Sequence, residues 1–218
     1  MKRILAATAF LICAATATAQ HNDTLTAHYD HTFRLKGIAV PAVLIASGAT
    51  ISETDLLHAR IDVPIQQWTQ RDGHGRNEIE NIFQYAPLAA VPVLKLCGVE
   101  SRHCWRDLAS LTGGAAILSF AFSTGIKSLT GTERPHGDVY NSFPSGHTTT
   151  AFMGAEILRR EYGGEHPGIA VAGYAVAAGV GCMRVYNNRH WASDVLAGAG
   201  FGILSASIMY WIGPYLRF

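Results

Sequence analysis

The chain has 218 residues, enough for one domain with a sizeable core and hardly enough for two. Charged residues make up 15% of it, against roughly 25% in an ordinary soluble domain, and apolar residues make up 49%. With 22 glycines, this composition favours helices that approach one another closely, in water or in lipid. The near-neutral charge offers no basic surface, and no nucleic-acid motif is present, so nucleic-acid binding is excluded.

The first nineteen residues have the pattern of a secretory signal peptide. Lys2 and Arg3 form a positive start, an apolar run follows over residues 4–15, and residues 17–19 supply a small-x-small cleavage site. We therefore expect residues 1–19 to be removed on export and residues 20–218 to form the mature domain. The alternative is that the leader stays in place as a first transmembrane helix.

Apolar segments of helical length follow, and alternating patterns of strand length are scarce. This predicts an all-α fold, a compact bundle of about six apolar helices, with an amphipathic or irregular stretch over residues 52–81. The predicted helices are Gly37–Ile51, Ile82–Val99, Leu111–Ile126, His147–Leu158, Gly168–Met183 and Val195–Ile212.

Segment length alone leaves open whether the bundle lies in a membrane. A span needs about 20 apolar residues, and only Val195–Ile212 meets that length comfortably. We expect a membrane-embedded bundle, and a soluble bundle of short Ala- and Gly-rich helices is the alternative.

The cysteines and histidines lack the spacing of metal ligands, so we expect chemistry without a bound metal or other cofactor. Cys97 and Cys104 are seven residues apart and could pair in an oxidising periplasm. Cys182 lies in an apolar segment and is expected to be buried.

The first of three chemically distinctive stretches is residues 127–135. Lys127 ends an apolar helix and Arg134 precedes Pro135, which would place two cations at one rim of the bundle. Taken alone, Lys127 would be a snorkelling residue and Arg134 a solvated loop charge.

The second stretch, Pro144-Ser145-Gly146-His147, opens an apolar helix. Free backbone N–H groups at a helix N-terminus bind phosphate, and glycine lets the backbone come close to the anion. A simple helix cap would explain Ser145 and leave His147 unexplained.

The third stretch runs from Arg184 to Asp194. His190 and Asp194 stand at i and i+4, a spacing that places them on one face of a helix. A carboxylate that accepts the proton of one ring nitrogen leaves the other nitrogen free to attack. Such a pair is common on helix surfaces, but with the two upstream stretches it supplies cations, a nucleophile and an acid, which are the requirements of phosphoryl transfer.

The ordered set Lys127-x6-Arg134-Pro135, Pro144-Ser145-Gly146-His147 and Arg184-x5-His190-x3-Asp194 resembles the three-part signature of the type 2 phosphatidic acid phosphatases. The resemblance covers residues 127–194 with every catalytic position in order. One position departs from the family pattern, because Met183 stands where a serine is usual.

The resemblance implies a role for each site residue. His190 would attack phosphorus, Asp194 would hold its ring, and His147 would protonate the leaving oxygen. The phosphoryl oxygens would be bound by Lys127, Arg134, Ser145, Gly146 and Arg184.

The resemblance further implies a metal-independent phosphatase that forms a phosphohistidine. We expect an envelope lipid as substrate: a lipid A phosphate, undecaprenyl diphosphate, phosphatidylglycerol phosphate or phosphatidic acid. The alternatives are a soluble periplasmic acid phosphatase of broad specificity and an inert member that only binds a phosphate headgroup. Export and apolar segments together predict the inner membrane, with the active site facing the periplasm. His136 and Asp138 could line the pocket, whereas His58, His74, His103 and His166 are expected to be ordinary polar-surface residues.

Overall fold

The computed structural model describes residues 35–71, 78–137 and 139–213, with the side chains from residue 37 onward. All regular secondary structure in this part of the chain is helical. The prediction of an all-α fold is confirmed, and each predicted apolar segment lies in or across helices. The predicted signal peptide lies outside the described residues. The elements are α2 (Leu35–Glu53), α3 (Asp55–Leu57), the π-helical turn η1 (His58–Asp62), α4 (Val63–Thr69), α5 (Glu80–Phe83), α6 (Ala86–Leu96), α7 (Trp105–Thr130), α8 (Gly146–Tyr162), α9 (Pro167–Tyr186) and α10 (Ala192–Ile212).

The predicted helix Ile82–Val99 is in fact two helices, α5 and α6, with a break before Pro87. Proline has no N–H to donate and its fixed φ suits the first turn of a helix, so α6 begins there as a new helix. Within α5, Glu80 is buried in the bundle while Ile82 is exposed.

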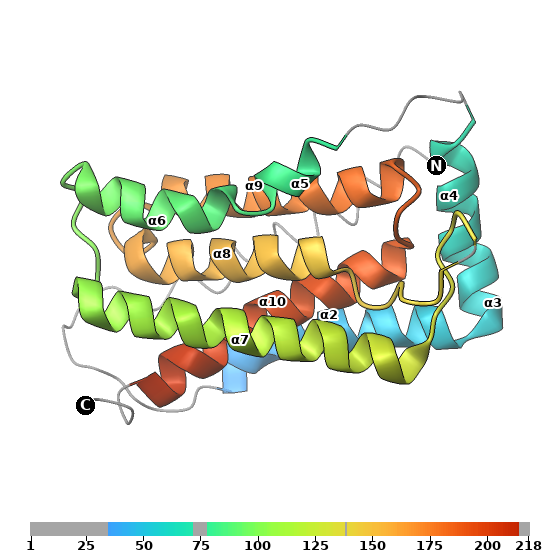
Figure 1. Ribbon diagram of the computed structural model, residues 1–218, viewed down its shortest axis with the longest axis horizontal. Coiled ribbons are helices and arrows are strands. Elements are labelled where there is room, and N and C mark those ends of the chain that lie inside the picture. The colour runs from blue at the N-terminus through green and yellow to red at the C-terminus, as the bar shows by residue number, and fades with distance from the viewer. Residues whose placement is uncertain (1–34, 72–77, 138, 214–218) are drawn as a thin grey trace.

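The central helix is α8, which packs against α6, α7, α9 and α10 (Figure 1). On its other side α10 packs against α2. Both contacts bring backbones together at glycine. A Cβ atom at Gly198 would lie 2.6 Å from the carbonyl oxygen of Ser145, and one at Gly48 would lie 2.6 Å from that of Ser193. The glycine-rich composition therefore serves close packing between helices, as predicted.

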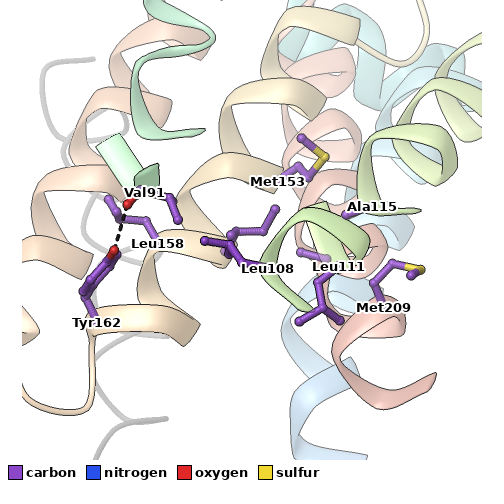
Figure 2. Close-up of a cluster of buried hydrophobic side chains, with 10 residues drawn as sticks. Val91, Leu108, Leu111, Ala115, Met153, Leu158, Tyr162 and Met209 are labelled. Atoms are coloured by element: carbon purple, nitrogen blue, oxygen red, sulfur yellow. Dashed lines mark hydrogen bonds between the residues drawn. The ribbon is translucent and has the colours of Figure 1, made fainter. Parts of the chain in front are cut away.

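A cluster of buried apolar side chains joins α6, α7, α8 and α10 (Figure 2). Within this cluster the hydroxyl of Tyr162 donates a hydrogen bond to the carbonyl oxygen of Val91 at 2.7 Å. The cluster includes Val91, Leu108, Leu111, Ala115, Met153, Ile157, Leu158, Tyr162, Ala206 and Met209. These contacts fix α7 and α8 relative to each other, so that the end of one lies near the start of the other.

All three motifs lie at one end of the bundle. Helices α7 and α9 end there, and α8 and α10 begin there (Figure 1). The segment from α3 to α4 crosses this end, after a bend of 91° from α2. We call this the site end.

Three of the described helices are long and apolar enough to cross a membrane: α7, α9 and α10. A fourth is added if α2 and the bent segment after it count as one span. The sequence expectation that only the last segment is comfortably long is wrong, because α7 and α9 both extend beyond the predicted segments. Large apolar side chains such as Ile117 and Phe120 are exposed along α7, as a surface facing lipid would be.

The end opposite the site holds a buried polar network around Glu161. Nδ1 of His103 lies 2.7 Å from Glu161, and the hydroxyl of Tyr210 donates to the same carboxylate oxygen. His103 is therefore a partner in the bundle rather than the surface residue predicted. Cys97 and Cys104, which could have paired, are both free thiols, and Cys182 is exposed on α9 instead of buried.

Candidate active site

His190 and Asp194 form a buried pair where α9 gives way to α10. Nδ1 of His190 lies 3.2 Å from Oδ2 of Asp194, and the backbone N–H of Trp191 donates to the same oxygen at 2.8 Å. The pair was predicted to share a helical face, but His190 precedes the first residue of α10. The contact arises because Asp194, in the first turn, caps its own helix. With Nδ1 held by the carboxylate, Nε2 is the nitrogen left to act as a nucleophile.

Burial lowers the pKa of His190 to about 4. Asp194 acts in the opposite direction and raises this pKa, whereas the positive charges of Lys127 and Arg184 lower it further. The imidazole is therefore neutral at pH 7. A neutral ring keeps the lone pair that nucleophilic attack requires.

Two cations hold the loop that leads into α8. Lys127, in the last turn of α7, donates to the carbonyl oxygens of Asn141 and Ser142, the latter at 3.1 Å. Nε of Arg134 donates to the Asn141 side chain at 2.8 Å. Burial, together with the charge of Arg189, lowers the pKa of Arg134 from its ordinary value.

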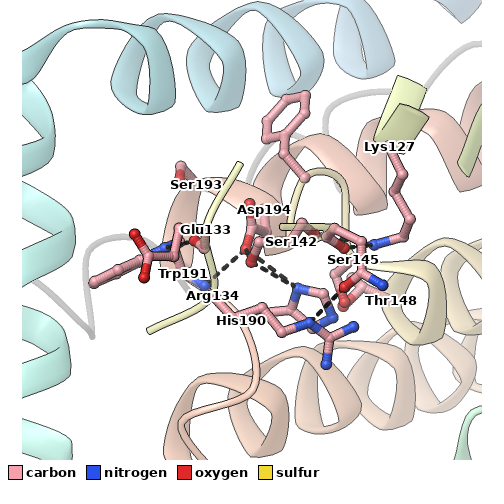
Figure 3. A network of polar contacts seen from close by, with 12 residues as sticks. Lys127, Glu133, Arg134, Ser142, Ser145, Thr148, His190, Trp191, Ser193 and Asp194 are labelled. Atoms are coloured by element: carbon pink, nitrogen blue, oxygen red, sulfur yellow. Dashed lines mark hydrogen bonds and ion pairs between the residues drawn. The ribbon is translucent and has the colours of Figure 1, made fainter. Parts of the chain in front are cut away.

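The same loop reaches the histidine–aspartate pair through Ser142 (Figure 3). The Ser142 hydroxyl donates to Oδ2 of Asp194 and lies 3.4 Å from Nδ1 of His190. Sequence reasoning missed Ser142, which lies outside all three motifs. The loop therefore links the cations of the first motif to His190, the predicted nucleophile of the third.

Ser145 is the N-cap of α8 and is fully buried. Its backbone N–H donates to the carbonyl oxygen of Asp194 at 3.0 Å. Its hydroxyl accepts from Oγ1 of Thr148 at 2.9 Å, so its own proton can be donated to an anion. Gly146 begins the helix, and the first N–H groups of a helix have no partner within it.

Arg184 is anchored from α5. Its Nη1 lies 3.1 Å from Oε1 of Glu80, which also accepts from Nδ2 of Asn187 at 2.9 Å. Among the described residues, Nε of Arg184 and Oε2 of Glu80 are buried without a hydrogen-bond partner. One edge of the guanidinium is thus fixed, and donors remain for a phosphoryl oxygen.

His147 contacts the next residue of α5, with Nε2 lying 2.9 Å from Oδ1 of Asn81. Burial lowers the pKa of His147 to about 4, and the positive charges of Arg184, Arg134 and Lys127 add to this, while Glu80 acts in the opposite direction. A bound phosphate would offset those cations and favour the protonated ring that a general acid needs. Sequence reasoning missed both Glu80 and Asn81.

The segment predicted to be amphipathic or irregular supports the start of α10. Asp62, in η1, accepts from the backbone N–H and the hydroxyl of Ser193 at 3.0 and 2.6 Å. Nδ1 of His58 lies 3.0 Å from the same carboxylate, and its ring meets that of Trp191 edge-on at 4.6 Å between centroids. The prediction of His58 as a polar-surface residue is therefore wrong.

The eight predicted site residues all lie at the site end, brought there by four helix ends. Within residues 35–71, 78–137 and 139–213, no three His, Cys, Asp or Glu side chains are grouped so as to hold a metal ion. Met183 precedes Arg184 in the last turns of α9 and is half-buried. Of the two pocket candidates, His136 lies in the turn after Arg134, and Asp138 is outside the described residues.

Curated relatives match part of the chain. The Lipid A 1-phosphatase of Porphyromonas gingivalis is 43% identical over 146 residues, which cover 66% of this chain and 33% of the relative. The bacitracin transport permease protein BcrC of Bacillus licheniformis is 33% identical over 81 residues, which cover 37% of this chain and 38% of the relative. The chain thus spans between a third and two fifths of the length of these relatives.

Two solved structures share the fold, each with a TM-score of 0.53. LpxE of Aquifex aeolicus is 23% identical, and the match covers 73% of this chain and 97% of that one. The transmembrane PAP2-type phosphatidylglycerolphosphate phosphatase from Bacillus subtilis is 17% identical, with 82% and 98% covered. The model of the PAP2 superfamily matches residues 108–218, just over half of the chain and all three motifs. The chain therefore belongs to the PAP2 superfamily, the type 2 phosphatidic acid phosphatases that its motifs resemble.

Proposed function

We propose that this chain is a metal-independent phosphatase that forms a phosphohistidine on His190 and acts on a phosphorylated lipid of the bacterial envelope. One observation carries the proposal: a buried, neutral His190, oriented by Asp194, lies in the same site as three cations. Cations around the equatorial oxygens and a nucleophile in line are what phosphoryl transfer requires.

Each residue then has a defined part in two steps. Nε2 of His190 forms a bond to phosphorus while the bond to the leaving oxygen breaks, and His147 gives that oxygen its proton. Water then attacks the phosphohistidine, His147 takes a proton from that water, and inorganic phosphate leaves. The charge of the transferring group is stabilised by Lys127, Arg134, Ser145, the Gly146 N–H and Arg184.

A lipid substrate is supported by two observations. Apolar side chains are exposed along the long helix α7, and the relative from P. gingivalis carries the name Lipid A 1-phosphatase. A lipid A phosphate is therefore the first candidate, ahead of undecaprenyl diphosphate, phosphatidylglycerol phosphate and phosphatidic acid. The exposed apolar surface disfavours the alternative, a soluble periplasmic acid phosphatase.

Within the same proposal the protein lies in the inner membrane with its site end facing the periplasm. The opposite end carries Lys95, Arg102 and Arg106 around the short connection between α6 and α7, and such positive loops tend to be cytoplasmic. Free thiols at Cys97 and Cys104 also suit a reducing compartment. In this orientation α2 begins on the cytoplasmic side, since a Cβ atom on Gly37 would lie 3.9 Å from Trp211 near the end of α10. The orientation therefore requires that residues 1–19 do not carry the start of α2 across the membrane, in contrast to the expectation from the signal-peptide pattern.

Thiol labelling tests this orientation. In a Cys13→Ser, Cys182→Ser background, a membrane-impermeant maleimide should leave Cys97 and Cys104 unlabelled until the inner membrane is permeabilised. Glu78→Cys, at a position 70% exposed at the site end, should label in intact cells once the other cysteines are replaced. The reverse pattern would place the site in the cytoplasm and would mean that the leader carries the start of α2 across the membrane.

Replacing the nucleophile should abolish turnover. We expect His190→Ala to lose at least about 10⁴-fold in kcat and to form no acid-labile phosphoenzyme on rapid quenching with ³²P-labelled substrate. The control is His166→Ala, an exposed histidine at the opposite end, which should behave as wild type. Wild-type activity should survive EDTA, and its loss with chelator would refute the metal-independent part of the proposal.

His147→Ala should lose kcat/KM, which reports the steps up to departure of the leaving group, in proportion to how much that group needs a proton. For an alkyl phosphate we expect a loss of about 10²–10⁴-fold, the usual worth of general acid catalysis. For p-nitrophenyl phosphate, whose leaving phenolate is stable without a proton, the loss should be far smaller. Equal losses on both substrates would show that His147 is not the acid.

Glu80→Gln tests the anchor of Arg184. The substitution keeps the shape but removes the charge that pairs with a buried guanidinium, so we expect kcat/KM to fall about 10- to 100-fold, mainly through KM. Glu78→Gln is the matched control, because Glu78 is 70% exposed and lies 3.6 Å from Arg189, and a pair of that kind contributes little. A lower melting temperature with unchanged KM would give Glu80 a purely structural role.

A further inference from the structure

We propose that the outward side of α5 and the residue pair after it, formed by Ile82, Phe83 and Tyr85, is the surface on which the hydrocarbon chain of the substrate lies as it leaves the active site. We call these three residues the α5 outer surface. The inference rests on the proposed function and adds to it the path of the lipid.

The first step is the position of α5 beside the reacting groups. Two consecutive residues of this short helix contact the site: Glu80 pairs with Arg184, and Asn81 lies 2.9 Å from Nε2 of His147. The helix is therefore fixed next to the group proposed to protonate the leaving oxygen.

The second step follows from the chemistry. A nucleophile that attacks in line has the leaving oxygen on the far side of phosphorus, and a general acid must be within hydrogen-bond reach of that oxygen. In a lipid phosphate the leaving oxygen carries the lipid. The first atoms of the lipid therefore emerge on the His147 side, and His147 is contacted by α5.

The third step is the character of the surface found there. Ile82 is 74% exposed, Phe83 46% and Tyr85 54%, whereas Glu80 at the start of the same helix is buried against Arg184. Exposed apolar side chains in a group mark a contact with another apolar body. Because Ile82 directly follows Asn81, which contacts His147, the hydrocarbon chain of the substrate is the occupant that the geometry favours over bulk bilayer lipid.

Chain length in the substrate separates these two occupants. Dioleoyl and dibutyryl glycerol phosphate share one phosphomonoester and one leaving oxygen, and both can be assayed in the same detergent. For the double variant Ile82→Ser, Phe83→Ser we expect kcat/KM to fall about tenfold on the dioleoyl substrate and by less than twofold on the dibutyryl substrate. Ile82→Leu, Phe83→Leu, which keeps the surface apolar, should restore the preference for the long chain.

The matched control is Ile117→Ser, Phe120→Ser on α7, where the two side chains are 70% and 71% exposed. This variant should leave both rates unchanged. An equal loss in the control on the dioleoyl substrate would mean that any exposed apolar surface counts, and an equal loss on both substrates in the α5 variant would mean that α5 only supports Arg184 and His147. Either result, or no loss at all, overturns the inference.

Failure of the proposed function would look different. Wild-type enzyme would then hydrolyse none of the four candidate lipid phosphates, or His190→Ala would hydrolyse both diacylglycerol phosphates at normal rates. A chain-length preference can be lost only from an enzyme that turns over the short substrate, so the two failures are distinguishable.

Discussion

The buried side chain of Asp194 is the point on which the rest of the site depends. Its Oδ2 contacts Nδ1 of His190, the hydroxyl of Ser142 and the backbone N–H of Trp191. The backbone carbonyl oxygen of Asp194 accepts from the backbone N–H of Ser145. These partners come from the third motif, the loop after the first motif and the second motif. A buried carboxylate without such partners would cost several kcal/mol. The same contacts of Asp194 therefore stabilise this end of the bundle and orient the proposed nucleophile, His190.

The three cations impose the opposite constraint, since like charges repel more strongly when burial removes water from between them. The cations are paired with acceptors from outside the three motifs. The carboxylate of Glu80 pairs with Arg184 at 3.1 Å, and backbone carbonyl oxygens of the loop before α8 accept from Lys127. The balance stays cationic around His147, whose pKa is lowered first by burial and then further by the charges of Arg184, Arg134 and Lys127. Under the proposed function, a phosphate dianion entering the site supplies the missing negative charge, so substrate binding and protonation of His147 favour each other.

Helix packing sets the distances that make this possible. At Gly198 the backbones of α8 and α10 approach so closely that a Cβ atom would lie 2.6 Å from the carbonyl oxygen of Ser145. The starts of these two helices carry Ser145 and Asp194, which bond directly across the same gap. A wider spacing would separate the helix start that is proposed to bind phosphate from the proposed nucleophile. The small residues that made the composition unusual thus help to set the geometry of the candidate site.

The sequence by itself predicted the all-α fold and the family, and it predicted eight site residues, which the fold brings to one end of the bundle. These predictions rest on local patterns, because the motif residues lie beside helix ends and their spacing can be read over a few turns of the chain. Even there, the structure differs in detail: α5 and α6 are separate helices, and His190 precedes α10 instead of sharing a helical face with Asp194. Only the fold decided the roles of Glu80, Asn81, Asp62 and Ser142. Glu80 meets Arg184 across 104 residues and Asp62 meets Ser193 across 131, and no periodicity or spacing in one sequence records a contact between segments so far apart.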